Sequence, residues 1–274
     1  MKQALRIYRF INIISLDVAL GAVMGAAFFS TVFHTSLLPQ GLAALGVSVW
    51  LIYSVDHLLD AYRLKNTASS ERHQFHQKHM KQITAAVILF SLVDGMLIFY
   101  VRPSVFNAGV LLAGVVIFYL LFHRWMYPLK EIAGAVLYSG GVLLPVVSLH
   151  SWPVEHPGVY LMVPFFLTAL INLIVFSWFG LEQDLRDGQL SLVTFIGKRA
   201  SSVVLAVLVA LQFSILGLLM ITTAYVIESI VLLAMNIVLA FMLLYPETFK
   251  KNDLYRIVGD IIFLFPLPYL LVHA

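Results

Sequence analysis

Nine long apolar stretches dominate this chain of 274 residues and leave only short connections between them. The hydrocarbon core of a bilayer is about 30 Å thick, and a helix needs about 20 apolar residues to cross it. The stretches are unbroken, whereas a membrane β-barrel would show alternating segments of about ten residues. The chain is therefore predicted to be an all-α polytopic membrane protein with nine transmembrane helices. They cover roughly residues 10–33, 40–60, 83–101, 105–122, 132–149, 159–181, 201–222, 226–244 and 257–272, and Pro266 and Pro268 should kink the last.

Composition excludes several classes of protein. Hydrophobic residues make up 61% of the chain and charged residues 11%, against about 25% charged in soluble domains. So few charges cannot cover a soluble enzyme or a nucleic-acid-binding domain, and a disordered chain is equally excluded. The chain has no cysteine, which rules out disulfides, zinc–cysteine sites and thiol catalysis.

The basic residues predict how the chain is oriented. With nine spans, all of the 17 lysines and arginines except Arg102 fall in loops on one side of the membrane. Basic loops stay in the cytoplasm. We therefore expect a cytoplasmic N-terminus, an external C-terminus and a multi-pass protein of the plasma (inner) membrane.

A pair of carboxylates ends the second span, at Asp56 and Asp60. At a spacing of four residues they share one helix face and repel each other, and the C-terminal end of a helix also disfavours anions. A divalent cation would offset this cost, since Mg²⁺ binds one or two carboxylates together with substrate phosphates. The alternative is a solvated helix end.

A second acidic cluster, Glu182, Asp184 and Asp187, follows the sixth span on the same predicted side. An ordinary alternative exists here, because Glu182 and Arg186 are spaced as a helical ion pair and Asp187-Gly188 is typical of a turn.

A third element with polar side chains, the loop between spans four and five, carries Tyr127 and Lys130. Lys130 could contact phosphate and Tyr127 could donate a hydrogen bond to it. The alternative is that Tyr127 is an interfacial residue and Lys130 an orientation charge.

Together these elements resemble the intramembrane prenyltransferase (UbiA) superfamily, and the resemblance covers nearly the whole chain. That family's first motif is Asn-x-x-x-Asp-x-x-x-Asp, in which Asp56 and Asp60 match and Ile52 replaces the Asn. The family often has Tyr-x-x-Lys-Arg between spans four and five, where Tyr127 and Lys130 match and Glu131 replaces the Arg.

The family's second motif begins with Asp-x-x-x-Asp and continues with Gly, Thr-Leu and a further Gly at fixed spacing. Gly180 stands at the first Asp position. The remaining positions match, with Ser for Thr, at Asp184, Gly188, Ser191, Leu192 and Gly197.

The resemblance implies one transmembrane domain over 1–274, with its helices around a central cavity, and an enzyme that uses Mg²⁺ to ionise an isoprenyl diphosphate. The prenyl group would pass to a lipophilic acceptor. The catalytic residues would be Asp56, Asp60 and Asp184; the metal ligands would be Asp56, Asp60, Asp184 and, as replacement carboxylates, Glu182 and Asp187; the diphosphate would contact Arg63, Tyr127, Lys130, Lys198 and Arg199.

Several alternatives stay open from the sequence. Either the metal site has been rebuilt, or the chain binds diphosphate in another way, or it has stopped being an enzyme. An active enzyme could instead cyclise the donor by itself, as a terpene cyclase does. A protein of another class, a non-catalytic lipid-binding or transport protein, is the third possibility.

Two further sets of polar residues stand out. His73, His76 and His79 are expected in a polar interfacial loop rather than at a metal site. Asp17, Asp94, Glu228 and Asp260 lie within apolar stretches, where a charge at the bilayer centre costs roughly 2.5–3.5 kcal/mol. Glu228 and Asp260 are near span ends and are expected to reach the interface, and Asp17 is expected to line a cavity.

Overall fold

The computed structural model describes residues 2–64, 70–122, 126–149 and 157–273, and all regular structure in these ranges is helical. The α-helices are α1 (Lys2–Ile13), α2 (Leu16–Val32), α3 (Pro39–Arg63), α4 (Glu71–Lys78), α5 (Met80–Leu97), α6 (Pro103–Phe122), α7 (Lys130–Leu149), α8 (Met162–Asp187), α9 (Leu192–Thr222), α10 (Val226–Leu244), α11 (Pro246–Lys250), α12 (Leu254–Ile261) and α13 (Pro266–His273). Short 3₁₀ turns lie at Ile98–Tyr100, Pro157–Leu161, Lys251–Asp253 and Ile262–Leu264.

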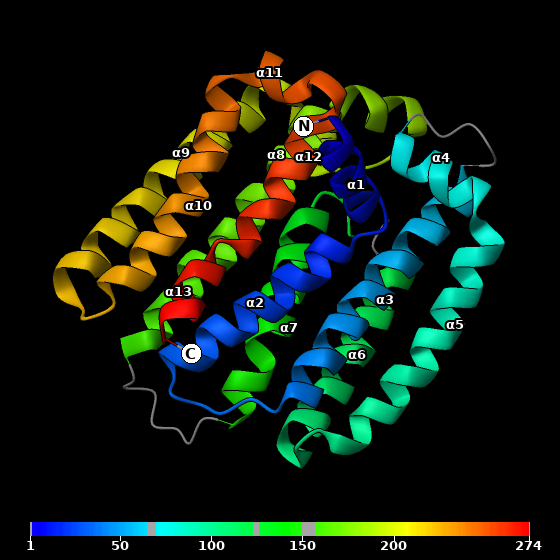
Figure 1. Cartoon of the computed structure of the whole chain (residues 1–274). Coiled ribbons are helices and arrows are strands. Elements are labelled where there is room, and N and C mark those ends of the chain that lie inside the picture. The colour runs from blue at the N-terminus through cyan, green and yellow to red at the C-terminus, as the bar shows by residue number, and fades with distance from the viewer. Residues whose placement is uncertain (1, 65–69, 123–125, 150–156, 274) are drawn as a thin grey trace.

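The number of membrane spans agrees with the nine that the sequence predicts, if one bent pair of helices is counted as a span. Eight segments of the described residues are long and apolar enough to cross a membrane, and one bent pair of helices would make a ninth. The prediction of an all-α polytopic membrane protein is thus confirmed. In Figure 1 the two chain ends lie at opposite ends of the bundle.

The first span, expected over 10–33, is sharply bent. Residues Arg6–Ile13 and Leu16–Val32 form two helices at 78° to each other. Ser15 lies between them with a φ of 57°, in the left-handed region. The bend turns three polar side chains into the protein, where Asn12, Ser15 and Asp17 are all buried.

The last span is broken as its prolines predict. The helix α12 gives way to the 3₁₀ turn Ile262–Leu264, and Pro266 begins α13. Near the end of α12, Gly259 packs directly against α8. A Cβ at Gly259 would collide with the side chains of Phe176 and Asn172, so a glycine is required for this close approach.

The helices differ sharply in how much of their surface is covered. In an apolar stretch of 18 consecutive residues, 61% are buried within the span Gly158–Asp187, which contains α8, against 6% in Met80–Tyr100 and 6% in Pro103–Phe122. The helix α8 therefore lies at the centre of the bundle, whereas α5 and α6 form a lipid-facing edge (Figure 1).

Candidate active site

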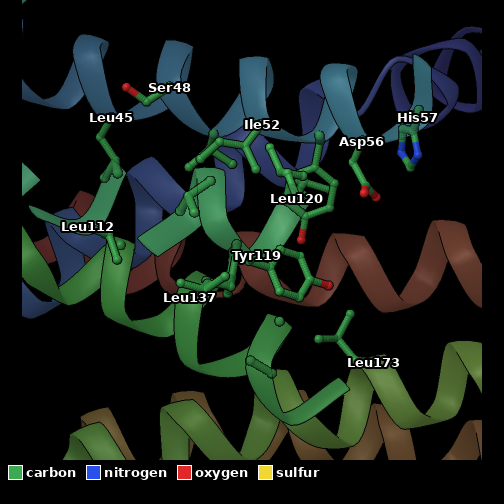
Figure 2. Close-up of a pocket in the computed structure, with 18 of the residues that line it drawn as sticks. Leu45, Ser48, Ile52, Asp56, His57, Leu112, Tyr119, Leu120, Leu137 and Leu173 are labelled. Atoms are coloured by element: carbon green, nitrogen blue, oxygen red, sulfur yellow. The ribbon is translucent and has the colours of Figure 1, made fainter. Parts of the chain in front are cut away.

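A cavity of about 530 Å³ lies between α3, α5, α6, α7, α8 and α12. Its walls are mostly apolar. Figure 2 shows Leu45 and Ile52 on α3, with Leu112 of α6, Leu137 of α7 and Leu173 of α8 on other sides. Binding sites for small molecules typically enclose about 300–1,000 Å³, so the cavity can hold a ligand with a long apolar part.

Charged side chains line this cavity where α3 and α8 end and α7 begins. Asp56 and Asp60 come from α3, Lys130 from α7 and Asp184 from α8. Four of the residues selected from the sequence therefore share one cavity. Asp60 is buried, and its carboxylate lies 3.9 Å from His73 Nε2.

Two other predicted diphosphate contacts, Arg63 and Tyr127, are not part of the described cavity wall. Arg63 is an exposed residue whose Nη1 lies 3.7 Å from Asp60 Oδ1. The ring of Tyr127 packs edge-on against Phe195, with 5.2 Å between ring centroids. Neither Arg63 nor Tyr127 is among the described residues that line the cavity.

The structure does not bring Glu182, Lys198 or Arg199 to the cavity. Glu182 is exposed, and one of its oxygens lies 2.9 Å from Lys250 Nζ. Two residues along a helix correspond to about 200° of rotation, so Glu182 faces away from the side that carries Asp184. Lys198 Nζ lies 4.4 Å from the ring centroid of Trp178, and Arg199 is exposed.

Asp187 is half-buried at the last position of α8, outside the described lining residues. Gly188 follows it with a φ of 62° and ends the helix, as the Asp-Gly turn predicts. Asp187 is therefore placed outside the described part of the cavity wall.

Glu131 has a structural function that the sequence did not reveal. Its buried carboxylate accepts hydrogen bonds from the backbone N–H of Leu192, at 3.0 and 3.1 Å, and from Ser177 Oγ at 2.8 Å. Because a helix N-terminus favours negative charge, Glu131 fixes the start of α9 against α7 and α8.

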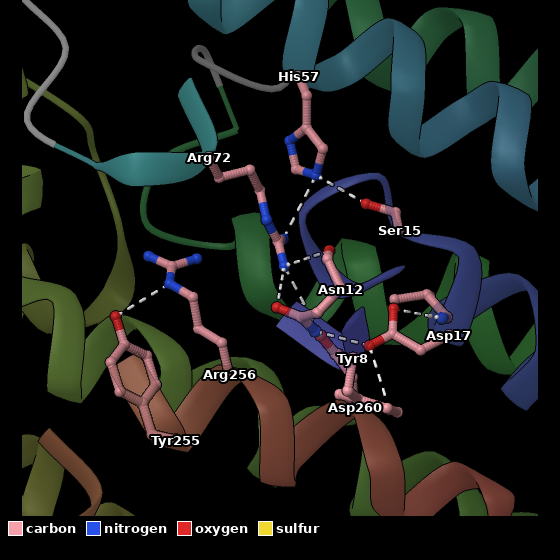
Figure 3. Close-up of polar contacts among 10 residues, drawn as sticks. Tyr8, Asn12, Ser15, Asp17, His57, Arg72, Tyr255, Arg256 and Asp260 are labelled. Atoms are coloured by element: carbon pink, nitrogen blue, oxygen red, sulfur yellow. Dashed lines mark hydrogen bonds and ion pairs between the residues drawn. The ribbon is translucent and has the colours of Figure 1, made fainter. Parts of the chain in front are cut away.

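A buried polar network joins α1, α2, α4 and α12 beside the cavity (Figure 3). Asn12 Nδ2 donates to Asp17 Oδ2 and to Asp260 Oδ2, each at 2.7 Å. Arg72 Nη2 donates to the backbone and side-chain oxygens of Asn12, both at 3.1 Å, and lies 3.7 Å from Asp260 Oδ2. Asp260 is buried, so the expectation that it reaches the interface is wrong. Asp17 was expected to line a cavity, but it is hydrogen-bonded within this network and is not among the described residues of the cavity wall.

The histidine-rich segment is a helix rather than a loop. Ser70 caps α4 by accepting a hydrogen bond from His73 N at 3.2 Å. His76 is buried, and its Nδ1 lies 2.8 Å from the Arg72 carbonyl oxygen. Burial lowers the pKa of His73 to about 4, although the carboxylate of Asp60 acts in the opposite direction.

Arg256, like Arg72, is a cation of this region that was not predicted from the sequence. It lies on α12 and lines the cavity together with Asp184. Its Nε donates to Tyr255 Oη at 3.0 Å. Its charge and that of Arg72 were assigned to membrane orientation, yet the acidic residues inside the spans were a signal that buried cations must lie nearby.

The residues present fit Mg²⁺ at the first cluster but not at the second. Asp56 and Asp60 offer two carboxylates on one helix face, which suits an ion completed by phosphate oxygens. On α8, Asp184 is a single carboxylate, Gly180 contributes none and Glu182 faces away. Among the described residues, no group of three or more His, Asp or Glu side chains is arranged to hold a metal ion.

The fold and cavity define a polytopic, all-helical membrane protein with an internal, mostly apolar cavity. The chain is similar to a solved structure of digeranylgeranylglyceryl phosphate synthase, with a TM-score of 0.56 over 99% of this chain and 100% of that one. The two sequences are 18% identical, so this likeness concerns the fold. No family model and no curated protein matches the sequence.

Proposed function

We propose that this chain is a membrane-embedded prenyltransferase-like enzyme that ionises an isoprenyl diphosphate and transfers the prenyl group to a lipophilic acceptor. The observation that carries the proposal is the cavity itself. It has long apolar walls and, where α3, α7 and α8 meet, carboxylates and a lysine. An isoprenyl diphosphate has the matching division into an apolar chain and a charged head.

The carboxylates and the lysine of the cavity would bind different components of the substrate complex. Asp56 and Asp60 would hold Mg²⁺, which supplies charge neutralisation for a leaving diphosphate when it is bound. Lys130 would bind a phosphate oxygen directly as a point charge. The site residues would thus favour the leaving group over the intact substrate, which is how an enzyme lowers a barrier.

The walls suit the other half of the reaction. An allylic cation must be kept from water, and aromatic faces attract cations. Tyr53, Tyr119 and Tyr138 line the cavity together with Phe176 and Phe263. These rings would shield and stabilise the cation until an acceptor reacts with it.

The test is release of pyrophosphate by the purified full-length protein from geranyl, farnesyl and geranylgeranyl diphosphates with Mg²⁺. Assays run with and without quinone and phenol acceptors, and products formed from donor alone would identify a cyclase. We expect the Asp56→Asn plus Asp60→Asn variant to lose about 3 kcal/mol of transition-state stabilisation, roughly a hundredfold in rate.

Glu182→Gln is the matched control, because this carboxylate lies in the same region but is exposed and paired with Lys250. Its rate should stay near that of the unaltered protein. Absence of pyrophosphate release from every donor and acceptor combination would refute the proposal and favour a lipid-binding or transport protein.

A further inference from the structure

We propose that Arg256 takes the place of a metal ion on the α8 side of the cavity and binds the diphosphate directly. This inference rests on the proposed function, since it concerns how the same substrate is held. It predicts that a metal ion binds only at Asp56 and Asp60, while the guanidinium of Arg256 supplies the positive charge on the α8 side.

The geometry around Gly180 places Arg256 where a second carboxylate would otherwise project. A Cβ built on Gly180 would lie 3.8 Å from Arg256 Nη2, 3.7 Å from Tyr255 Oη and 3.8 Å from Asp184 Oδ1. The missing acid of the second motif and the guanidinium therefore face the same small volume. That volume adjoins the cavity, because Arg256 and Asp184 both line it.

The guanidinium is held with its outer nitrogens available. Arg256 Nε donates to Tyr255 Oη, and the Tyr255 ring stacks on Phe179 at 4.8 Å and 11°. In Figure 3 the dashed line from Tyr255 ends at Arg256 Nε, and none ends at either Nη atom. Among the described residues, no hydrogen bond or ion pair involves either Nη atom.

The position of α12 is fixed one helical turn away. Gly259 allows α12 to pack directly on Asn172 and Phe176 of α8, which keeps the Arg256 backbone close to Gly180.

The chemistry favours a guanidinium over a metal here. A lone Asp184 gives a cation one protein ligand, and a positive neighbour repels any ion that approaches. Arginine instead presents parallel N–H donors that match two phosphate oxygens and stays charged at every physiological pH. The arginine would thus neutralise the diphosphate without the carboxylates that a second metal needs.

The experiment measures binding of inorganic pyrophosphate to the full-length protein by calorimetry, once in EDTA and once with Mg²⁺. We expect measurable binding in EDTA, and we expect Arg256→Gln to weaken it by about tenfold to a hundredfold. Lys198→Gln, which removes an exposed cation beside Trp178, should change it little.

A pair of variants at Gly180 provides a test that leaves Arg256 intact. Contacts of 3.7–3.8 Å allow a Cβ at this position, so Gly180→Ala should bind pyrophosphate nearly as tightly as the unaltered protein. Gly180→Asp should pair with Arg256 and weaken binding in EDTA about as much as Arg256→Gln does. A second metal site would give the opposite result, with tighter binding in Mg²⁺ and one additional Mn²⁺ counted by electron paramagnetic resonance.

The inference is overturned if pyrophosphate does not bind in EDTA, if Arg256→Gln binds as tightly as the unaltered protein, or if Gly180→Asp gains affinity with an additional bound ion. Failure of the proposed function looks different. In that case pyrophosphate still binds through Arg256, but no isoprenyl diphosphate is cleaved. Unchanged turnover by Arg256→Gln would refute this inference and leave the proposed function standing.

Discussion

Replacing Arg72 with methionine should remove a large part of the protein's resistance to unfolding. The residue is 8% exposed, and its Nη2 atom contacts Asn12 twice at 3.1 Å and Asp260 at 3.7 Å. Methionine fills similar space but leaves the buried carboxylates of Asp17 and Asp260 without this cation. Removing one partner of a buried ion pair costs about 3–5 kcal/mol, and we expect a loss in that range.

A double-mutant cycle separates the charge interaction from lost packing. Asp260→Asn should destabilise the protein less than Arg72→Met, because an amide keeps a hydrogen-bonding group opposite Asn12. In the double variant the ion pair has lost both members, so neither Arg72 nor Asp260 is left as an unpaired charge, and only Asp17 still lacks the cation. The combined loss should therefore fall short of the sum of the single losses, by about 0.5–3 kcal/mol, the usual coupling for residues in contact.

The assay is equilibrium unfolding of the purified protein in mixed micelles with increasing dodecyl sulfate, followed by circular dichroism. Arg102→Met serves as the control, since this arginine is exposed and exposed substitutions usually change stability by less than about 0.5 kcal/mol. A loss below about 1 kcal/mol for Arg72→Met, or strict additivity in the double variant, would refute the interpretation of this network.

Three further outcomes are expected. Glu131→Ala should lower the free energy of unfolding by about 1–3 kcal/mol, because the Leu192 N–H at the start of α9 loses its buried acceptor; an unchanged unfolding curve would contradict this. The free energy of unfolding should fall as the pH drops from about 6.5, the ordinary pKa of histidine, to about 4, the value to which burial lowers the pKa of His73. The reason is that the unfolded chain binds the proton at a higher pH than the folded protein does. His73→Gln should reduce this pH dependence when unfolding is measured across the same window. Lys198→Gln should leave the KM for isoprenyl diphosphate unchanged in the pyrophosphate-release assay, and a clear rise in KM would return this lysine to the site.

The sequence predicted those features that depend on neighbours along the chain. Apolar runs of about 20 residues specify membrane helices, and a four-residue spacing places Asp56 and Asp60 on one helix face. The bend at Ser15 escaped this reasoning, because its cause is burial of Asn12 and Asp17 against a distant helix. Local pattern contains no information about such a partner.

The same distinction applies to the site residues: those in a local sequence motif could be predicted, and those without one could not. Asp184 and Lys130 were found because each stands in a recognisable motif, whereas Arg72 and Arg256 have no motif around them. Hydropathy explains any basic residue near a span end as an orientation charge. Only the three-dimensional packing distinguishes such a charge from a buried ion-pair partner or a ligand in a cavity wall.

The Asn12–Asp260 contact, between residues 248 positions apart, has a consequence for biogenesis. Ribosomes deliver the chain to the bilayer from its N-terminus, so Asp17 is inserted long before Asp260 is made. Until then the nascent protein carries Asp17 with an incomplete set of the polar partners that it has in the folded protein. Assembly of the first helices can therefore become final only when the last one has left the translocon.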